Sequence, residues 1–203
     1  HSKTVFFERS EETLWVALQV HLLTKDNGTG RLAYDRVLDA ICRLNMDYAP
    51  ANIQFYLKNS INVINRSEWY THQTIPQGID MMLTSNVEGA LNTYFVSDPA
   101  GNCGYNLPYA GVAIGHGCSA PTDHTWAHEA GHALSLPHPF IGWEGKTFSF
   151  SLPTPELLTY DYTHFHDSLE VQGPAPLDTA LVEMLDGCNC SDVAALICGT
   201  KPD

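Results

Sequence analysis

The stretch "TDHTWAHEAGHALSLPHPF", residues 122–140, decides how the rest of the sequence is interpreted. Its histidines His128 and His132 are four residues apart, so on a helix they project from one face about one turn apart and can bind one metal ion together. Thr122 or Asp123 is suited to cap such a helix at its N-terminus. The spacing therefore predicts a metal-binding helix.

His138 is the predicted third ligand of this metal, which we expect to be zinc. It follows His132 by six residues, too far round to share its helix face, and Pro137 and Pro139 prevent the helix from continuing on either side. A zinc ion with three protein ligands keeps a fourth position for water. Glu129, next to the first ligand, can reach that water without binding the metal itself.

Other residues are weaker candidates for the third ligand. His124 shares a helix face with His128, but it is eight residues from His132, about 12 Å along a helix axis, whereas zinc–nitrogen bonds are only about 2.0–2.1 Å. A glutamate ligand is the arrangement of thermolysin-like enzymes. That arrangement needs a second helix after His138, and the sequence there does not look helical around the available glutamates Glu144, Glu156 and Glu170.

Composition limits the classes of protein that fit. The 203 residues are 44% hydrophobic, enough for one sizeable domain, and no apolar run approaches the roughly 20 residues that cross a bilayer. A net charge of −13 argues against binding to nucleic acid or to anionic lipid. The acidic surplus is compatible with structural calcium without specifying it. We expect a monomer that acts on protein or peptide substrates.

The cysteines are even in number and contain no paired C-x-x-C motif of a zinc ribbon, which favours disulfides and an extracellular protein over reduced thiols in a cytosolic one. We predict two pairs, Cys103–Cys118 between neighbouring extended segments and Cys190–Cys198 around a short loop. The remaining two form a third pair or stay unpaired: Cys42 and Cys188.

Hydrophobic periodicity predicts an α/β arrangement with at least one parallel crossover. Apolar residues alternate in the expected strands and recur at three- and four-residue steps in the first helix. In chain order we expect a strand at 13–24, a helix at 31–48, an extended strand at 52–64, a short helix at 78–85, strands at 90–98 and 109–116, and then the histidine-rich helix up to about residue 135.

The histidine-rich stretch resembles the zinc motif of metzincin metalloproteases and, among them, of the pappalysin family. The residues that carry this resemblance are "HEAGHALSLPHPFIGWEG" at 128–145. Other stretches are similar in order and spacing to the upper lobe of those enzymes and, less completely, to a segment further downstream that normally carries a cysteine pair: "ANIQFYL" (51–57), "MLTSNVEGALNTYFVSDPAG" (82–101), "GVAIG" (111–115), "VEMLDGCNC" (182–190) and "ICGTKPD" (197–203).

The resemblance implies an α/β fold: a metzincin-like catalytic domain with a twisted mixed sheet and an active-site helix, plus an irregular, incomplete C-terminal lobe. Residues 1–138 would form the upper lobe with the zinc-binding helix, and residues 139–203 the lower lobe. The strand near Ala113, Ile114 and Gly115 would form the upper rim of the cleft, where an extended substrate adds as a further strand.

Three departures from the family pattern stand out. Ser135 occupies the position where most metzincins have glycine, so a tight turn must be made without glycine's conformational freedom. Gly199 stands where the family often has aspartate, which weakens any carry-over of a calcium site. Met184 is the only methionine after His138 and lacks the sequence context of a Met-turn, so we expect the chain to stop before that turn.

The sequence thus predicts a secreted zinc endopeptidase in which Glu129 acts as general base and then as general acid. One alternative is a zinc-binding module, degenerate or truncated, that holds the ion without hydrolysing peptides. A second metal site is conceivable at His164 and His166, which alternate as on a strand, although a polar loop explains them more simply.

Overall fold

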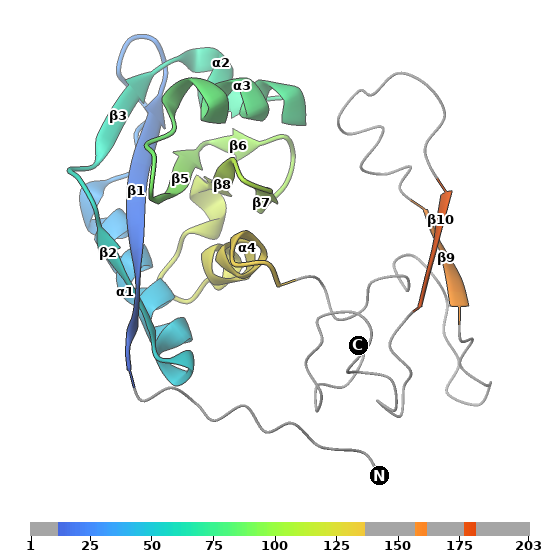
Figure 1. The fold of residues 1–203 in the computed structure, drawn as a ribbon. Helices are drawn as coiled ribbons and strands as arrows, with labels where there is room; N and C mark the ends of the chain where they lie inside the picture. The colour runs from blue at the N-terminus through green and yellow to red at the C-terminus, as the bar shows by residue number, and fades with distance from the viewer. Residues whose placement is uncertain (1–11, 137–156, 162–176, 182–203) are drawn as a thin grey trace. The chain divides into compact units, whose positions relative to one another are not determined.

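The computed structural model describes residues 12–136, 157–161 and 177–181 (Figure 1). The chain divides into two compact units, His1–Ala133 and Leu134–Asp203. In the second unit the described elements are β9 (Leu157–Asp161) and β10 (Leu177–Leu181), which pair antiparallel. The boundary that the sequence predicts after residue 138 lies outside the described residues, so the division into lobes stays a prediction.

The first unit contains the other described elements. They are, in chain order, β1 (Leu14–Thr24), α1 (Tyr34–Tyr48), the 3-10 helix η1 (Ala49–Ala51), β2 (Ile53–Leu57), β3 (Asn62–Asn65), α2 (Ser67–Tyr70), β4 (Thr71–His72), α3 (Ile75–Ser85), β5 (Leu91–Val96), β6 (Asp98–Pro99), β7 (Gly104–Leu107), β8 (Gly111–Gly115), the 3-10 helix η2 (His116–Cys118) and α4 (Thr125–Ala133).

A mixed sheet forms the centre of this unit, with the strand order β2-β1-β5-β8-β7 and β3 beside β1. All neighbours pair in parallel except β7, which runs antiparallel to β8. Parallel strands require crossovers, and the connecting helices cover both faces of the sheet. The mixed α/β fold that the sequence predicts is therefore present.

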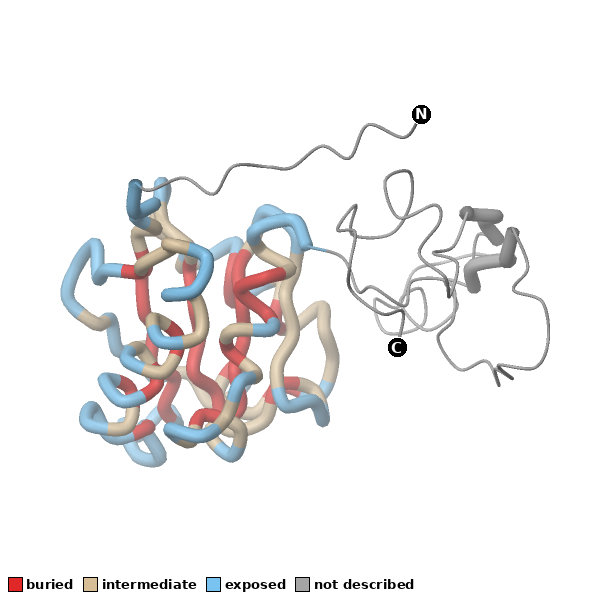
Figure 2. The backbone as a smooth tube through the Cα atoms, turned by 90° about the horizontal axis from the view of Figure 1, so that it is seen from below, coloured by how far each residue is buried: buried red, intermediate tan, exposed pale blue. Residues whose placement is uncertain are grey.

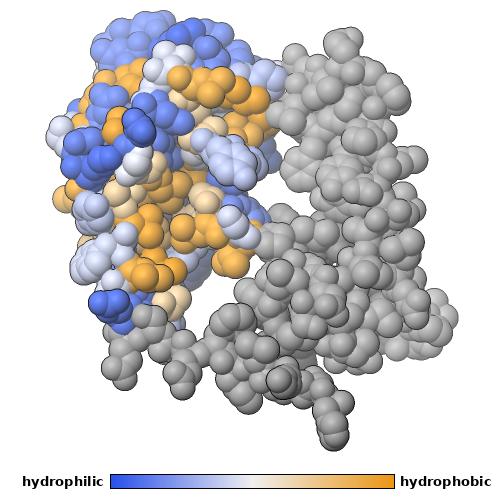
Figure 3. Space-filling view, viewed as in Figure 1, coloured by the Kyte–Doolittle hydropathy of each residue, from blue (hydrophilic) through white to orange (hydrophobic). Residues whose placement is uncertain are grey.

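The core lies in two layers, one on each face of the sheet (Figure 2). On one face, alternate residues of β1 pack with α1 and α4; Leu18, Leu22, Val37 and Trp126 belong to this layer. The other layer packs against α2 and α3. The exposed apolar side chains on the face seen in Figure 3 lie in several patches among hydrophilic ones. No helix among the described residues has the length and apolar character needed to cross a membrane.

The extended strand predicted at 52–64 is two strands in the structure, β2 and β3, both paired with β1. The cause is Gln19, a buried polar residue of β1. Its side-chain amide donates to the carbonyl of Ser60 (3.1 Å) and its Oε1 accepts from Asn59 (2.9 Å). These bonds hold the chain in a loop between the two strands. The strand β7, which has four residues, was not predicted from the sequence.

His21 is a fully buried histidine on β1 (0% exposed) that is held in its neutral form. Its Nδ1 lies 3.2 Å from the side-chain amide nitrogen of Asn62, a donor, and its Nε2 lies 3.1 Å from Oδ1 of Asn92, an acceptor. The ring stacks on Tyr94 at 4.3 Å. Burial lowers the pKa of His21, and the hydrogen bond to Asn92 opposes this only in part.

We expect His21 to make the protein less stable in acid. The pKa of His21 in the folded protein lies below its value of about 6.5 in the unfolded chain. At pH values between these two pKa values the unfolded state binds more protons than the folded state. The free energy of unfolding is therefore highest above about pH 6.5 and decreases as the pH falls. For one such group, the free energy of unfolding decreases by about 1.4 kcal/mol for each pH unit within this range. Urea unfolding of zinc-free protein between about pH 8 and 5 measures the slope. His21→Gln, which keeps a donor and an acceptor, should flatten it; an identical slope would contradict the assignment.

Candidate metal centre and active site

The helix predicted to carry the histidines is present as α4, which begins at Thr125, where the side chain of Asp123 accepts a hydrogen bond from the backbone N–H (2.8 Å). The helix ends at Ala133, and Ser135 then adopts a φ of +74°. This left-handed conformation, which glycine adopts more readily, costs a residue with a side chain roughly 1–2 kcal/mol. The turn expected after the helix thus begins at Ser135 without glycine.

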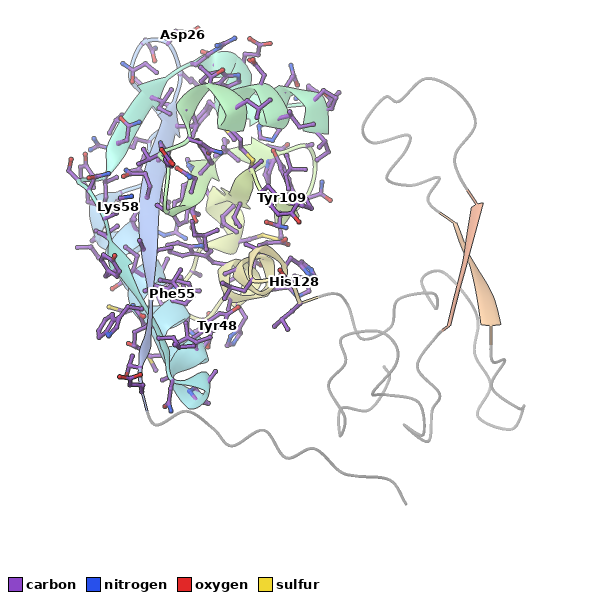
Figure 4. The ribbon with its side chains drawn as sticks, in the orientation of Figure 1. Asp26, Tyr48, Phe55, Lys58, Tyr109 and His128 are labelled. Atoms are coloured by element: carbon purple, nitrogen blue, oxygen red, sulfur yellow. A yellow bond between two sulfur atoms is a disulfide. The ribbon has the colours of Figure 1, made fainter. Side chains whose placement is uncertain are left out.

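The rest of the unit holds α4 against the sheet. Trp126 is buried, packs edge-on against Phe95 at 5.1 Å and donates from Nε1 to the hydroxyl of Thr93 (3.2 Å). From α1, the hydroxyl of Tyr48 donates to the carbonyl of Ala127 (2.9 Å; Figure 4). These contacts hold α4 in position, and its histidines with it.

His128 and His132 lie side by side on α4. Their Nε2 atoms are 3.0 Å apart and their rings stand at 87° to each other. Two nitrogens at about 2.0–2.1 Å from a tetrahedral zinc ion are about 3.3 Å apart, so this pair suits zinc after a small rotation. Figure 4 shows His128 projecting away from β1. Burial, and then the neighbouring His132, lower the pKa of His128.

The third predicted ligand, His138, lies outside the described residues. Among the residues that the structure describes, no group of three or more histidine, cysteine, aspartate or glutamate side chains is placed to hold a metal ion. The possible second site at His164 and His166 and the glutamate candidates after His138 also fall outside them.

Glu129 is the buried carboxylate of the site, with 8% of its surface exposed. Burial raises its pKa, while the charge of His132 and a hydrogen bond from the backbone N–H of Asn106 act in the opposite direction. Asn106 belongs to β7, which packs against α4 at the edge of the sheet. The sequence pattern gave no sign of this contact because β7 itself was not predicted.

His124 is turned toward α1. Its Nδ1 lies 3.0 Å from a carboxylate oxygen of Asp47, and its side chain is 64% exposed. Asp47 also forms an ion pair with Arg43, one turn earlier on the same helix. This pairing gives His124 a role in joining α1 to the start of α4 that is independent of a metal.

A cleft of about 530 Å³ opens at the start of α4. It extends from the start of β7 to His128 and the buried carboxylate of Glu129. Its walls consist of Cys103, Gly104, Thr122, Asp123, His124, Thr125, His128 and Glu129.

The prediction that Ala113, Ile114 and Gly115 form the rim strand needs correction. These residues belong to β8, which is buried and paired on both sides, with β5 and with β7. Its backbone hydrogen-bonding groups are used within the sheet, so it has no edge to offer a substrate. In the part of the chain that the structure describes, the strand at this edge is β7.

The predicted disulfide between Cys103 and Cys118 is confirmed, with the two Cα atoms 5.4 Å apart. It joins the residue before β7 to the end of η2, and so ties the start of the edge strand to the chain leading into α4. Cys42 is a free, exposed cysteine. The other predicted pair, Cys190–Cys198, and Cys188 lie outside the described residues.

One known protein that is similar to this chain is a metalloprotease. No family model matches the chain. It is 31% identical over 132 residues to extracellular metalloprotease 1 of Coccidioides posadasii, a match that covers 56% of this chain and 47% of the relative. The chain is similar in sequence to a metalloprotease. It spans about half the length of that relative.

Among solved structures, mature mirolysin of Tannerella forsythia in complex with a cleaved peptide is similar, with a TM-score of 0.51 and 22% identity over 69% of each chain. At this identity the likeness shows the fold. The twisted mixed sheet with its helices, which the sequence analysis predicts, is thus shared with a solved structure.

Proposed function

We propose that the protein is a secreted zinc-dependent endopeptidase of the metzincin type. The observation that carries this proposal is the arrangement on α4: two histidine Nε2 atoms 3.0 Å apart, with the buried carboxylate of Glu129 beside them at a cleft. The similarity to an extracellular metalloprotease supports the reaction class and the location. The pappalysin family is the finer assignment, supported by the residues around "HEAGHALSLPHPF".

The proposed zinc ligands are His128, His132 and His138. The first two stand at a separation that suits one zinc ion, and the third follows a turn that begins at Ser135. When bound, zinc supplies Lewis-acid chemistry, because it lowers the pKa of coordinated water to about 7 and polarises a carbonyl. Structural calcium stays an open part of the prediction.

Glu129 would move the protons of the reaction. It accepts a proton from the attacking water and later delivers it to the leaving amine, so one carboxylate serves as general base and then as general acid. Its burial between α4 and β7 restricts the positions that the carboxylate can take. Such restriction favours catalysis because the proton acceptor needs no rearrangement before the reaction.

The free side of β7 is the proposed binding site for an extended peptide. Backbone pairs alternate along an antiparallel ladder, and Gly115 donates to the carbonyl of Cys103 (2.8 Å). The groups of Tyr105 therefore point toward β8, whereas those of Gly104 and Asn106 point outward. A peptide chain can pair as an added strand with the outward groups of Gly104 and with the outward carbonyl of Asn106, whose N–H faces Glu129.

A cleavage assay with metal removal tests the proposal. We expect the full-length protein to cleave a diverse peptide library, a chelator to abolish cleavage, and zinc to restore it. Mapping the cleavage sites by mass spectrometry also gives the side-chain preference. If zinc binds in one equivalent but no peptide in the library is cut, the second candidate function, a zinc-binding module without hydrolytic activity, takes its place.

A further inference from the structure

The edge strand β7 packs against α4, and Gly104 at its start lines the same cleft as Glu129, so the position of the proposed general base depends on this strand. This strand has only four residues and, among the described residues, pairs with one neighbour, β8. A short edge strand with one partner opens more readily than an interior strand, since fewer hydrogen bonds oppose its motion. A second contact that holds β7 in place would therefore also affect the position of Glu129.

Tyr105 makes that contact on the opposite face of the sheet. Successive side chains of a strand point to opposite faces, so Tyr105 packs with the core layer under α3, away from Gly104 and Asn106. Its hydroxyl lies 2.9 Å from Nε2 of His72, and Nδ1 of His72 lies 3.1 Å from the carbonyl of Trp69. A carbonyl only accepts, so Nδ1 carries the proton and Nε2 accepts from the tyrosine.

The surroundings keep this pair neutral and in place. Burial lowers the pKa of His72, with the bond to Trp69 and the charge of Asp98 acting against it, and burial raises the pKa of Tyr105. A Cβ added to Gly78 of α3 would come within 2.9 Å of Cζ of Tyr105 and 3.4 Å of Nε2 of His72. Glycine at position 78 therefore leaves the space that the tyrosine occupies.

We propose that Tyr105 and His72 are positioning residues for catalysis, which hold β7 in place against α4 at the cleft where Glu129 lies. The proposal rests on the proposed function for its catalytic part. Neither residue touches the cleft side of β7; both act through the strand.

The variant Tyr105→Phe removes one hydroxyl and no volume from the core, and Tyr70→Phe is its control. The hydroxyl of Tyr70 donates to the carbonyl of Gly30 (3.0 Å), a contact that involves neither β7 nor α4. In the zinc-loaded full-length protein we expect Tyr105→Phe to lower kcat about 10-fold, with KM within about twofold, because small misplacements of a reacting group have effects of up to about 100-fold. Tyr70→Phe should retain wild-type kcat.

Amide hydrogen exchange in zinc-free protein gives a readout that does not depend on hydrolysis. We expect the amide of Asn106 to exchange about 10-fold faster in Tyr105→Phe than in Tyr70→Phe, because β7 opens more often. At position 72, His72→Gln keeps a donor and an acceptor and should retain more of the wild-type kcat than His72→Leu, which keeps neither. Circular dichroism at the assay temperature verifies that each variant is folded.

The outcomes separate this proposal from the proposed function. Unchanged kcat and unchanged exchange at Asn106 in Tyr105→Phe overturn the positioning role, even where Glu129→Gln is inactive. A loss of kcat that only follows the unfolded fraction overturns it as well. Full activity in Glu129→Gln would instead remove the proposed function, and faster exchange at Asn106 would still support the anchoring of β7.

Discussion

Replacing Glu129 with glutamine is expected to lower kcat by about 10²–10⁴-fold while zinc binding and the fold are retained. Glutamine keeps the volume of the side chain and removes only the charge that accepts a proton. The loss should fall on kcat rather than on KM, since the carboxylate acts on the proton in the transition state and does not hold the substrate. Steady-state kinetics on a peptide cleaved by the wild type measures it.

Glu88→Gln is the matched control, because it removes the same charge from an exposed residue between α3 and β5. It should have wild-type kinetics. Zinc content of Glu129→Gln, measured by metal analysis, should equal that of the wild type because Glu129 is not a proposed ligand. Wild-type hydrolysis in Glu129→Gln that a chelator still abolishes would show that another group accepts the proton.

Replacing His138 with alanine is expected to weaken zinc binding by more than about 100-fold. Partners that only orient a metal ligand contribute about 10–100-fold to affinity, so the loss of a ligand itself should cost at least as much. The remaining pair, His128 and His132, would bind zinc weakly through two nitrogens. Competition with a chromophoric chelator at constant pH measures the dissociation constant.

His124→Ala is the control for this experiment. His124 lies on the same stretch of chain but pairs with Asp47 (3.0 Å), so its removal should leave zinc affinity within about threefold of the wild type. Undiminished affinity in His138→Ala would mean that the third ligand lies elsewhere. A large loss in His124→Ala would make His124 that ligand.

Local features of this protein were predictable from sequence. The separation of His128 and His132 depends only on the pitch of a helix, so the pairing of their Nε2 atoms followed from a four-residue spacing. The amphipathic pattern of α1 and the alternation in β1 likewise report which face of each element is buried.

Features that depend on distant partners were not predictable. The segment 52–64 has the composition of one strand, and it divides only because Gln19, about 40 residues earlier, binds the loop between β2 and β3. The strand β7 is too short for its alternation to stand out from its neighbours.

The sequence by itself determined the helix that carries His128 and His132, the spacing of these two residues and the α/β class, because helix pitch and strand alternation are properties of neighbouring residues. Only the tertiary structure decided which strand borders the site. Strand order is set by pairing between residues far apart in the chain, so β8 became an interior strand and β7 the edge. The packing of β7 against α4 and the contact between Tyr105 and His72 exist for the same reason, since each joins elements that meet only after the sheet has formed.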